Sequence, residues 1–245
     1  MYYAIYFSPT YNTEKACRYF CCGEYSCIDL IKNKDEIVLR EDDVAVIGVP
    51  SYAGRVPSYA LSKLKKIKGN GTKAILISSY GNRASEDTLI ELFDAVKENG
   101  FLPIAGMELV APHSIFKNVA ANRPDGMDYK DYANFKIAIL KKLEGEASLA
   151  TMPGNRPYKE VKESTLVPIC TDSCVDCKAC SISCPTKAIS YDDVKITNPS
   201  LCIHCMRCTA VCKFDARVIE PSVYEAMSNR LMKAFEGRKP NNLYL

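Results

Sequence analysis

Short apolar runs alternate with helix-like stretches through the first half of the chain. The runs are predicted to be strands from their length and their β-branched and aromatic content, at residues 2–7, 25–30, 44–49, 73–78 and 101–110. Helices are predicted at residues 13–22, 57–66, 85–99 and 128–143. Because the strands are continuously apolar and separated by helices, the pattern predicts an α/β domain over residues 1–145, with a parallel sheet covered on both faces.

The periodicity fades over residues 146–166, where Pro153, Gly154 and Pro157 interrupt any regular element, and we expect a linker there. A small domain is expected over residues 167–220. In the remaining segment, residues 221–245, a helix is predicted over 222–236, ended by Gly237 and followed by a polar tail.

The small domain contains an internal repeat of cysteines. Of the 13 cysteines, four precede residue 28 and nine lie between Cys170 and Cys212. The spacing C-x2-C-x2-C-x3-C occurs at Cys174, Cys177, Cys180 and Cys184, and recurs 28 positions later at Cys202, Cys205, Cys208 and Cys212. Such a run directs three thiolates to one 4Fe-4S cluster and the fourth elsewhere, and in a two-cluster ferredoxin that fourth cysteine binds the other cluster. The predicted ligand sets are Cys174, Cys177, Cys180 and Cys212 for cluster I, and Cys202, Cys205, Cys208 and Cys184 for cluster II.

The repeat resembles bacterial-type two-cluster ferredoxins over residues 167–220. Two zinc sites are the alternative, although zinc motifs usually pair two C-x2-C units at a longer separation. Lys213 stands where the first repeat has Pro185, and we expect it to be solvated, as we do His204. Cys170 is expected to be a spare thiol. The early cysteines, Cys17, Cys21, Cys22 and Cys27, are expected to be packing residues.

Overall charge and hydropathy exclude several classes of partner. The net charge of +3, from 32 basic and 29 acidic residues, argues against nucleic acid or an anionic membrane as the main partner. No apolar run reaches the length that spans a bilayer, and the first residues lack the basic start of a signal peptide, so no membrane insertion is expected. We therefore expect a soluble, cytoplasmic protein in which cysteines bind metal rather than form disulfides.

Three loops that follow predicted strands are candidate ligand loops. The first leads directly into a helix, where backbone N–H groups and hydroxyls can surround a phosphate, although its residues are also ordinary helix caps. The second and third contain glycines that let the backbone approach a ligand. The candidate residues are Ser8, Thr10, Tyr11, Asn12 and Thr13 in the first loop, Pro50, Ser51, Tyr52, Ala53 and Gly54 in the second, and Ser79, Tyr80, Gly81, Asn82 and Arg83 in the third.

The first loop resembles the phosphate loop of the flavodoxin family, which binds FMN, although that family usually has glycine where this chain has Tyr11. The resemblance implies a five-stranded sheet in the order 2-1-3-4-5. Tyr52 and Tyr80 are candidates to stack on the flavin ring, and Asn82 and Arg83 are candidates to bond its polar atoms. The alternatives are a proline-bounded turn with an exposed aromatic for the second loop, and a cap of the helix that begins near residue 85 for the third. His113, after the fifth strand, is a weaker candidate.

Nearly the whole chain resembles the EFR-type ferredoxins of anaerobes, in which a flavodoxin-like domain precedes a two-cluster ferredoxin domain. This resemblance implies FMN, two 4Fe-4S clusters and electron transfer with a protein redox partner that the motifs do not identify. An electron carrier is favoured over a dedicated substrate enzyme, with a flavin-dependent oxidoreductase and a homodimer left open. The alternative is a redox-responsive protein-binding module without flavin chemistry.

Overall fold

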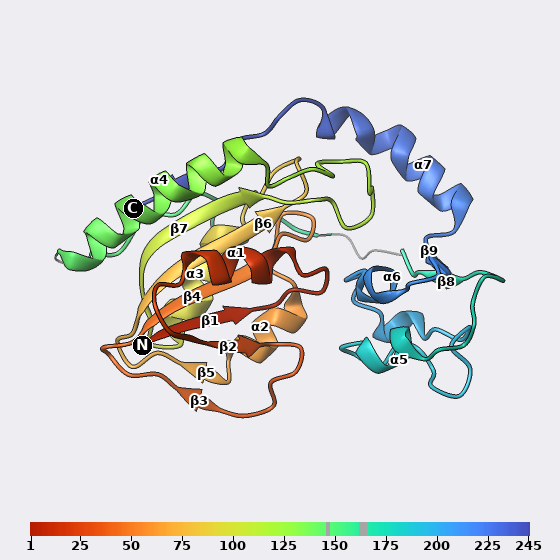
Figure 1. The fold of residues 1–245 in the computed structure, drawn as a ribbon, viewed down its shortest axis with the longest axis horizontal. Helices are drawn as coiled ribbons and strands as arrows, with labels where there is room; N and C mark the ends of the chain where they lie inside the picture. Colours follow the sequence, from red (N-terminus) through yellow and green to blue (C-terminus); the bar gives the residue numbers. More distant parts are fainter. Residues whose placement is uncertain (146–147, 162–165) are drawn as a thin grey trace. The chain divides into compact units, whose positions relative to one another are not determined.

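The computed structural model describes residues 1–145, 148–161 and 166–245, which fall into two compact units (Figure 1). The sheet unit comprises Met1–His113, Lys117–Val161 and Gly237–Leu245. The cysteine unit comprises Ser114–Phe116 and Lys162–Glu236. The chain thus leaves the sheet unit, builds the cysteine unit and then returns. Among the described residues, no helix has the length and apolar character needed to cross a bilayer.

The sheet unit has the elements that the hydrophobic pattern predicts, with bounds that differ by a few residues at most. Its main strands are β1 (Tyr2–Tyr6), β2 (Tyr25–Asp29), β4 (Val44–Pro50), β6 (Lys73–Tyr80) and β7 (Leu102–Val110). Its helices are α1 (Asn12–Phe20), α2 (Ser58–Leu64), α3 (Thr88–Glu98) and α4 (Gly126–Glu144). Two short strands, β3 (Ile37–Val38) and β5 (Ile67–Lys68), pair beside them.

The main strands lie in the order β2-β1-β4-β6-β7, and all neighbouring pairs among them are parallel. This is the flavodoxin-like order 2-1-3-4-5, and it confirms the predicted fold class. Helices α1 and α4 share one apolar core against the sheet, which includes Cys17, Phe20 and Tyr132. Since parallel strands end at one sheet edge, the loops after β1, β4 and β6 all emerge at the edge where such folds bind ligands.

The sheet has a sixth strand that the sequence does not predict. In β10 (Asn242–Tyr244) the returning chain pairs antiparallel with β7, so that Leu243 lies opposite Met107. The polar composition of residues 239–242 predicts a tail, but the edge of β7 offers unpaired backbone groups to any segment that reaches it. The expected free tail is therefore an edge strand.

Residues 148–161, which the sequence assigns to a linker, also pack on the sheet unit. The Ala150 N–H donates to the Pro103 carbonyl at 3.0 Å, and Met152 is buried against Gly106, where a Cβ would come 2.3 Å from its sulfur. Arg156 pairs with Asp94 through both guanidinium edges, at 2.8 and 2.5 Å. The prolines and the glycine interrupt regular secondary structure in this segment, but the segment still packs on the sheet unit.

The cysteine unit is built from two copies of one backbone pattern. Helix α5 (Ala179–Ser183) and helix α6 (Arg207–Val211) lie 28 positions apart, as the cysteines do. Left-handed residues recur at the same offset, in the pairs Asp176 and His204, Lys178 and Met206, and Lys187 and Asp215. Strands β8 (Ile169–Cys170) and β9 (Arg217–Val218) pair antiparallel, and a short helix (Pro199–Leu201) precedes the second repeat.

After the second repeat come α7 (Pro221–Leu231) and a final helical turn (Met232–Phe235), which together cover the helix predicted at 222–236. Phe116 stacks on Tyr224 and Phe235 with ring centroids 5.4 Å apart in both cases. These three rings give α7 its apolar contact within the cysteine unit.

A buried ion pair anchors the returning segment to the sheet unit. Asp128 is fully buried and accepts hydrogen bonds from both edges of the Arg123 guanidinium and from the Asn241 amide at 2.7 Å. Asn241 in turn accepts the Val110 N–H at 2.9 Å. Although burial alone would raise the pKa of Asp128, the hydrogen bonds from Arg123 and other donors hold it below its ordinary value.

Replacing Asp128 tests this anchor. We expect Asp128→Ala to lower the free energy of unfolding of the sheet unit by about 3–5 kcal/mol, because it leaves the Arg123 charge buried and unpaired. Lys32→Ala removes a pair with Asp29 in which the lysine side chain is 76% exposed, and is expected to cost less than about 1 kcal/mol. Since the Asp128 pKa is depressed in the folded state, its contribution is fully present above about pH 4 and is lost as pH falls below that value. Denaturant unfolding at two pH values measures both effects, and equal costs for the two variants would contradict the assignment.

Candidate functional site

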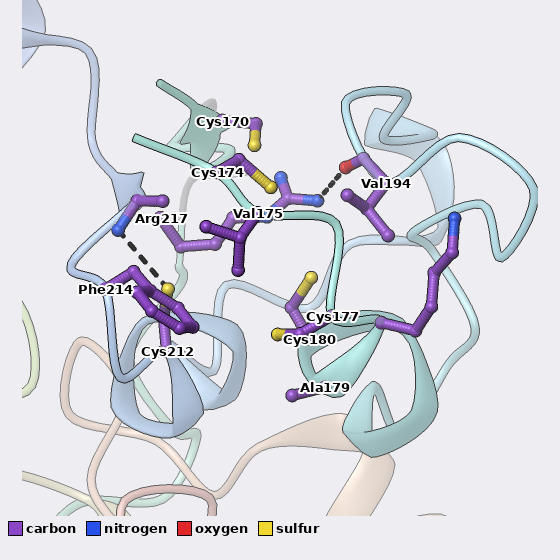
Figure 2. Close-up of a pocket in the computed structure, with 12 residues that line it drawn as sticks. Cys170, Cys174, Val175, Cys177, Ala179, Cys180, Val194, Cys212, Phe214 and Arg217 are labelled. Carbon is purple, nitrogen blue, oxygen red and sulfur yellow. Dashed lines mark hydrogen bonds between the residues drawn. The ribbon is translucent and has the colours of Figure 1, made fainter. Parts of the chain in front are cut away.

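A cavity in the cysteine unit collects cysteines from both repeats (Figure 2). Its empty space, including the open mouth, is about 330 Å³. The lining thiols are Cys174, Cys177 and Cys180 of the first repeat, Cys212 of the second, and Cys170. Thus the structure brings together all four residues of the set predicted for cluster I, including the one from the distant repeat.

The second set of thiols also mixes the repeats. Burial raises the pKa of Cys205 to about 11 and that of Cys208 to about 12, and the nearby thiols of Cys184 and Cys202 add to both shifts. Burial likewise raises the pKa of Cys202, with Cys184 again contributing. Cys184, the last cysteine of the first repeat, therefore lies near the three leading cysteines of the second. Because metal ligands must be thiolates, loading this set releases protons.

Backbone N–H groups reach cysteine sulfur at equivalent places in the two repeats. The Ala188 N–H donates to the Cys184 Sγ at 3.3 Å, and the Ala216 N–H donates to the Cys212 Sγ at 3.2 Å. The latter bond is drawn in Figure 2. Hydrogen bonds to sulfur stabilise the more negative state of an iron-sulfur cluster, so the pattern suits a redox cluster.

The cavity also has a buried donor without an acceptor. The Nε–H of Arg217 has no hydrogen-bond partner among the described residues, although Arg217 is only 3% exposed and lines the cavity. An anionic 4Fe-4S cluster held by four thiolates would supply the missing acceptor. Four cysteines of the two repeats and this donor thus line one cavity, and this arrangement suits a cluster.

The first candidate loop of the sheet unit forms a tight turn at the start of α1. Tyr11 adopts a left-handed backbone conformation, with φ 67°, and its N–H donates to the Ser8 carbonyl at 3.3 Å. Glycine favours this conformation, and Tyr11 adopts it here although its side chain makes the conformation less favourable. The Ser8 hydroxyl accepts the Glu14 N–H at 3.0 Å, whereas the side chains of Thr10 and Asn12 are half-buried beside the helix start.

Short bonds join this loop to the other two candidate loops. The Thr13 and Ser79 hydroxyls are 2.6 Å apart, and the Ser51 N–H donates to the Ser79 carbonyl at 2.8 Å. Pro50 pairs with Ser79 in the sheet. The rings of Tyr52 and Phe7 meet edge to face with centroids 6.5 Å apart. The structure therefore brings all three predicted loops to one place at the sheet edge.

The second loop is a tight reversal in which Tyr52 and Arg55 exchange backbone hydrogen bonds at 3.0 and 3.1 Å. Ala53 and Gly54 both have positive φ, at 52° and 89°. A Cβ on Gly54 would also lie 1.9 Å from a Glu86 carboxylate oxygen, so glycine is required there for close approach as well as for conformation.

The side chains of the third loop bond to other parts of the sheet unit. The Tyr80 ring is 6% exposed, and its hydroxyl donates to the Pro240 carbonyl at 2.6 Å. The Asn82 amide donates to the Gly237 carbonyl at 2.8 Å. Arg83 pairs with Glu86 at 2.8 and 3.0 Å, which lowers the pKa of Glu86 to about 2. In this structure the side chains of Tyr80, Asn82 and Arg83 bond to other residues of the sheet unit.

Gly81 and His113 are close neighbours, since a Cβ on Gly81 would come 2.4 Å from the His113 ring. Burial, followed by the nearby charge of Arg83, lowers the pKa of His113 to about 4. His113 is therefore neutral at physiological pH. His204, predicted to be solvated, instead places Nδ1 2.9 Å from the Leu166 carbonyl oxygen.

Sequence reasoning missed two contributors to these sites. The segment Gly237–Pro240 engages the third loop, and no local pattern reports a contact so distant in sequence. Arg217 could have been found, because it occupies the position that buried Ile189 occupies in the first repeat.

Comparison with known proteins identifies the cysteine region. Residues 173–216 match the family described as a 4Fe-4S dicluster domain. Ferredoxin Fdx2 of Sorangium cellulosum is 34% identical over 62 residues, which cover 22% of this chain and 61% of that protein. A polysulfide reductase subunit of Wolinella succinogenes is 40% identical over 53 residues, covering 20% of this chain and 28% of that protein. The chain thus matches less than two thirds of either relative, within its own ferredoxin-like region.

Solved structures resemble the sheet unit at low identity. Oxidised flavodoxin 1 from Bacillus cereus has 17% identity and a TM-score of 0.42, over 57% of this chain and 97% of that one. An NADH:FMN oxidoreductase in its apo form has 16% identity and a TM-score of 0.42, over 60% and 94%. The strand order, and not these matches, establishes the flavodoxin-like topology. Together the two parts form a flavodoxin-like domain followed by a ferredoxin-type 4Fe-4S domain, a combination that indicates electron transfer.

Exchange of the fourth ligand gives a direct test of the two cysteine sets. We expect Cys184→Ala to damage the cluster held by Cys202, Cys205 and Cys208, and Cys212→Ala to damage the cluster held by Cys174, Cys177 and Cys180. Cys170→Ala, at the remaining thiol of the cavity, is the matched control and is expected to retain both clusters.

Iron analysis and electron paramagnetic resonance of each variant, prepared without oxygen, distinguish the two clusters. Damage by each substitution to the cluster of its own repeat would contradict the exchange.

Proposed function

We propose that this chain is an electron-transfer flavo-iron-sulfur protein, which passes electrons between FMN, two 4Fe-4S clusters and an external protein redox partner. The observation that carries the proposal is the cavity in which Cys212 joins three cysteines of the other repeat. Cluster I takes Cys174, Cys177, Cys180 and Cys212, while cluster II takes Cys202, Cys205, Cys208 and Cys184. We expect the protein to work in the cytoplasm, where thiols stay reduced.

For FMN, the start of α1 is the proposed phosphate site. The first N–H groups of a helix have no intrahelical partner and favour an anion. Thr10, Asn12 and the left-handed Tyr11 surround this position, and Lys15 lies one turn into the helix. Tyr52 is the ring proposed to contact the flavin, since it is half-buried next to the same loop while Tyr80 is buried.

Bound FMN would exchange two electrons or one, whereas a 4Fe-4S cluster exchanges one. The chain's own contribution is to keep both kinds of group on one polypeptide. The cysteine unit is connected to the sheet unit at both of its ends, because the chain returns at Gly237. A double connection favours exchange within a chain over exchange between chains.

One observation favours the second candidate, a redox-responsive protein-binding module without flavin. Tyr80 and Asn82 of the third loop are already bonded to the returning segment. Cofactor content separates the two functions. Protein purified without oxygen is expected to contain about eight irons and eight sulfides per chain in two clusters, with one FMN. Iron and sulfide without FMN would support the binding module, and zinc in place of iron would overturn both.

A charge placed in the first loop tests the phosphate site. We expect Thr10→Glu to weaken FMN binding about tenfold or more, because a carboxylate would face the phosphate dianion. Thr10→Gln, of the same length without the charge, is expected to weaken it less. Riboflavin, which lacks the phosphate, should bind both variants alike. Fluorescence titration of the apo flavin site measures the affinities of the wild type and of both variants for FMN and for riboflavin, and an equal loss for FMN and riboflavin would exclude this loop as the phosphate site.

A further inference from the structure

A buried arginine lies at the centre of the cysteine unit. Arg217, in β9, is 3% exposed, and no carboxylate of the described residues forms an ion pair with it. A buried cation without an anion is unfavourable, since desolvation is not offset by an opposite charge. The first repeat has the apolar Ile189 at the equivalent position, 5% exposed, so the ferredoxin-like backbone does not itself require a charge there.

Three neutral oxygen acceptors hold the guanidinium in place. Nη1 donates to the Pro168 carbonyl at 3.1 Å and to the Thr197 hydroxyl at 3.0 Å, and Nη2 donates to the Val194 carbonyl. In Figure 2 the side chain reaches from β9 to this last carbonyl along the wall of the cavity that contains Cys174. These bonds orient the group and leave its positive charge uncompensated.

Arg217 lies near cysteines of both repeats. Its Nη2 donates to the carbonyl of Val194, and Val194 belongs to a small buried cluster with Cys180 and Ile189. Cys184 and Cys208, both assigned to the second cluster, pack against this buried cluster. In addition, Arg217 lines the cavity of Cys174, Cys177, Cys180 and Cys212. One cation therefore lies beside both proposed cluster sites.

We propose that Arg217 is the residue that sets the reduction potentials of the two clusters, by stabilising their reduced states with a buried positive charge. The inference rests on the proposed function, since it requires clusters at these cysteines. Reduction adds one electron to a cluster and no proton, so the cluster becomes more negative by one charge. The unpaired Nε–H of Arg217 is available to cluster or cysteine sulfur.

Removing the charge while keeping side-chain length tests the inference. Redox titration with dithionite measures the reduction potentials of the clusters. We expect Arg217→Met to lower the equilibrium constant for cluster reduction about tenfold, which corresponds to a fall in reduction potential of about 59 mV for one electron. Arg217→Lys keeps a cation and is expected to lower it much less. Lys213→Met removes an exposed charge next to Cys212 and is expected to leave both potentials unchanged, because water screens that charge.

A second pair of variants covers the case in which Arg217→Met does not load iron. Thr197→Asp would place a carboxylate against the guanidinium and neutralise it without removing its bonds to Pro168 and Val194. Thr197→Asn is the neutral control. We expect a fall in potential for Thr197→Asp and a smaller change for Thr197→Asn.

The outcomes separate the two claims. Wild-type protein that contains no reducible clusters would overturn the proposed function and this inference together. If the wild-type protein has reducible clusters and Arg217→Met has the same cluster potentials, the inference alone would be overturned. Where Arg217→Met lacks iron, unchanged potentials in Thr197→Asp would have the same meaning. A fall in potential shared equally by Arg217→Lys and Arg217→Met would also overturn it, because it would indicate a packing role without a role for the charge.

Discussion

A 4Fe-4S cubane needs four thiolates around it, and one C-x2-C-x2-C-x3-C run directs only three of them to the same place. The rest of the cysteine unit follows from this constraint. The two repeats share one backbone, down to left-handed residues at matching offsets, and Cys212 of the second lines a cavity with three cysteines of the first. Neither proposed site is complete within its own repeat. Folding of the two repeats and assembly of the two proposed clusters therefore depend on each other.

Electrostatics explains why such a unit tolerates a buried arginine. Thiols at Cys205 and Cys208 are buried deeply enough to resist ionisation on their own. In the proposed function, iron would offset that cost by binding the thiolate form, and each bound cluster would leave a net negative charge in a low-dielectric interior. Arg217 lines the cavity of Cys174, Cys177, Cys180 and Cys212, where its charge would stabilise the cluster. In the sheet unit, by contrast, the buried charge of Asp128 is matched locally by Arg123, and the pair anchors the returning chain.

The sequence predicts those features that depend on local patterns. The five parallel strands follow from continuous apolar runs, and the cysteine spacing identifies the 4Fe-4S domain that the family match confirms. What it misses depends on contacts between distant segments. The loop pattern predicts that Tyr80 faces a ligand, but its hydroxyl meets Pro240, and residues 148–161 pack on the sheet despite their prolines and glycine. Polar composition predicts a tail and carries no information about the exposed edge of β7 that binds it.

The central claim is that one chain moves electrons between a flavin and its own clusters. Anaerobic rapid mixing tests it most directly, with FMN-loaded protein reduced at one centre and the absorbance of flavin and clusters followed in time. The account predicts redistribution of electrons at a rate that stays constant as protein concentration is varied, since both kinds of centre belong to one polypeptide connected at two points. A rate that rises in proportion to protein concentration would contradict it, because the electrons would then pass between separate molecules.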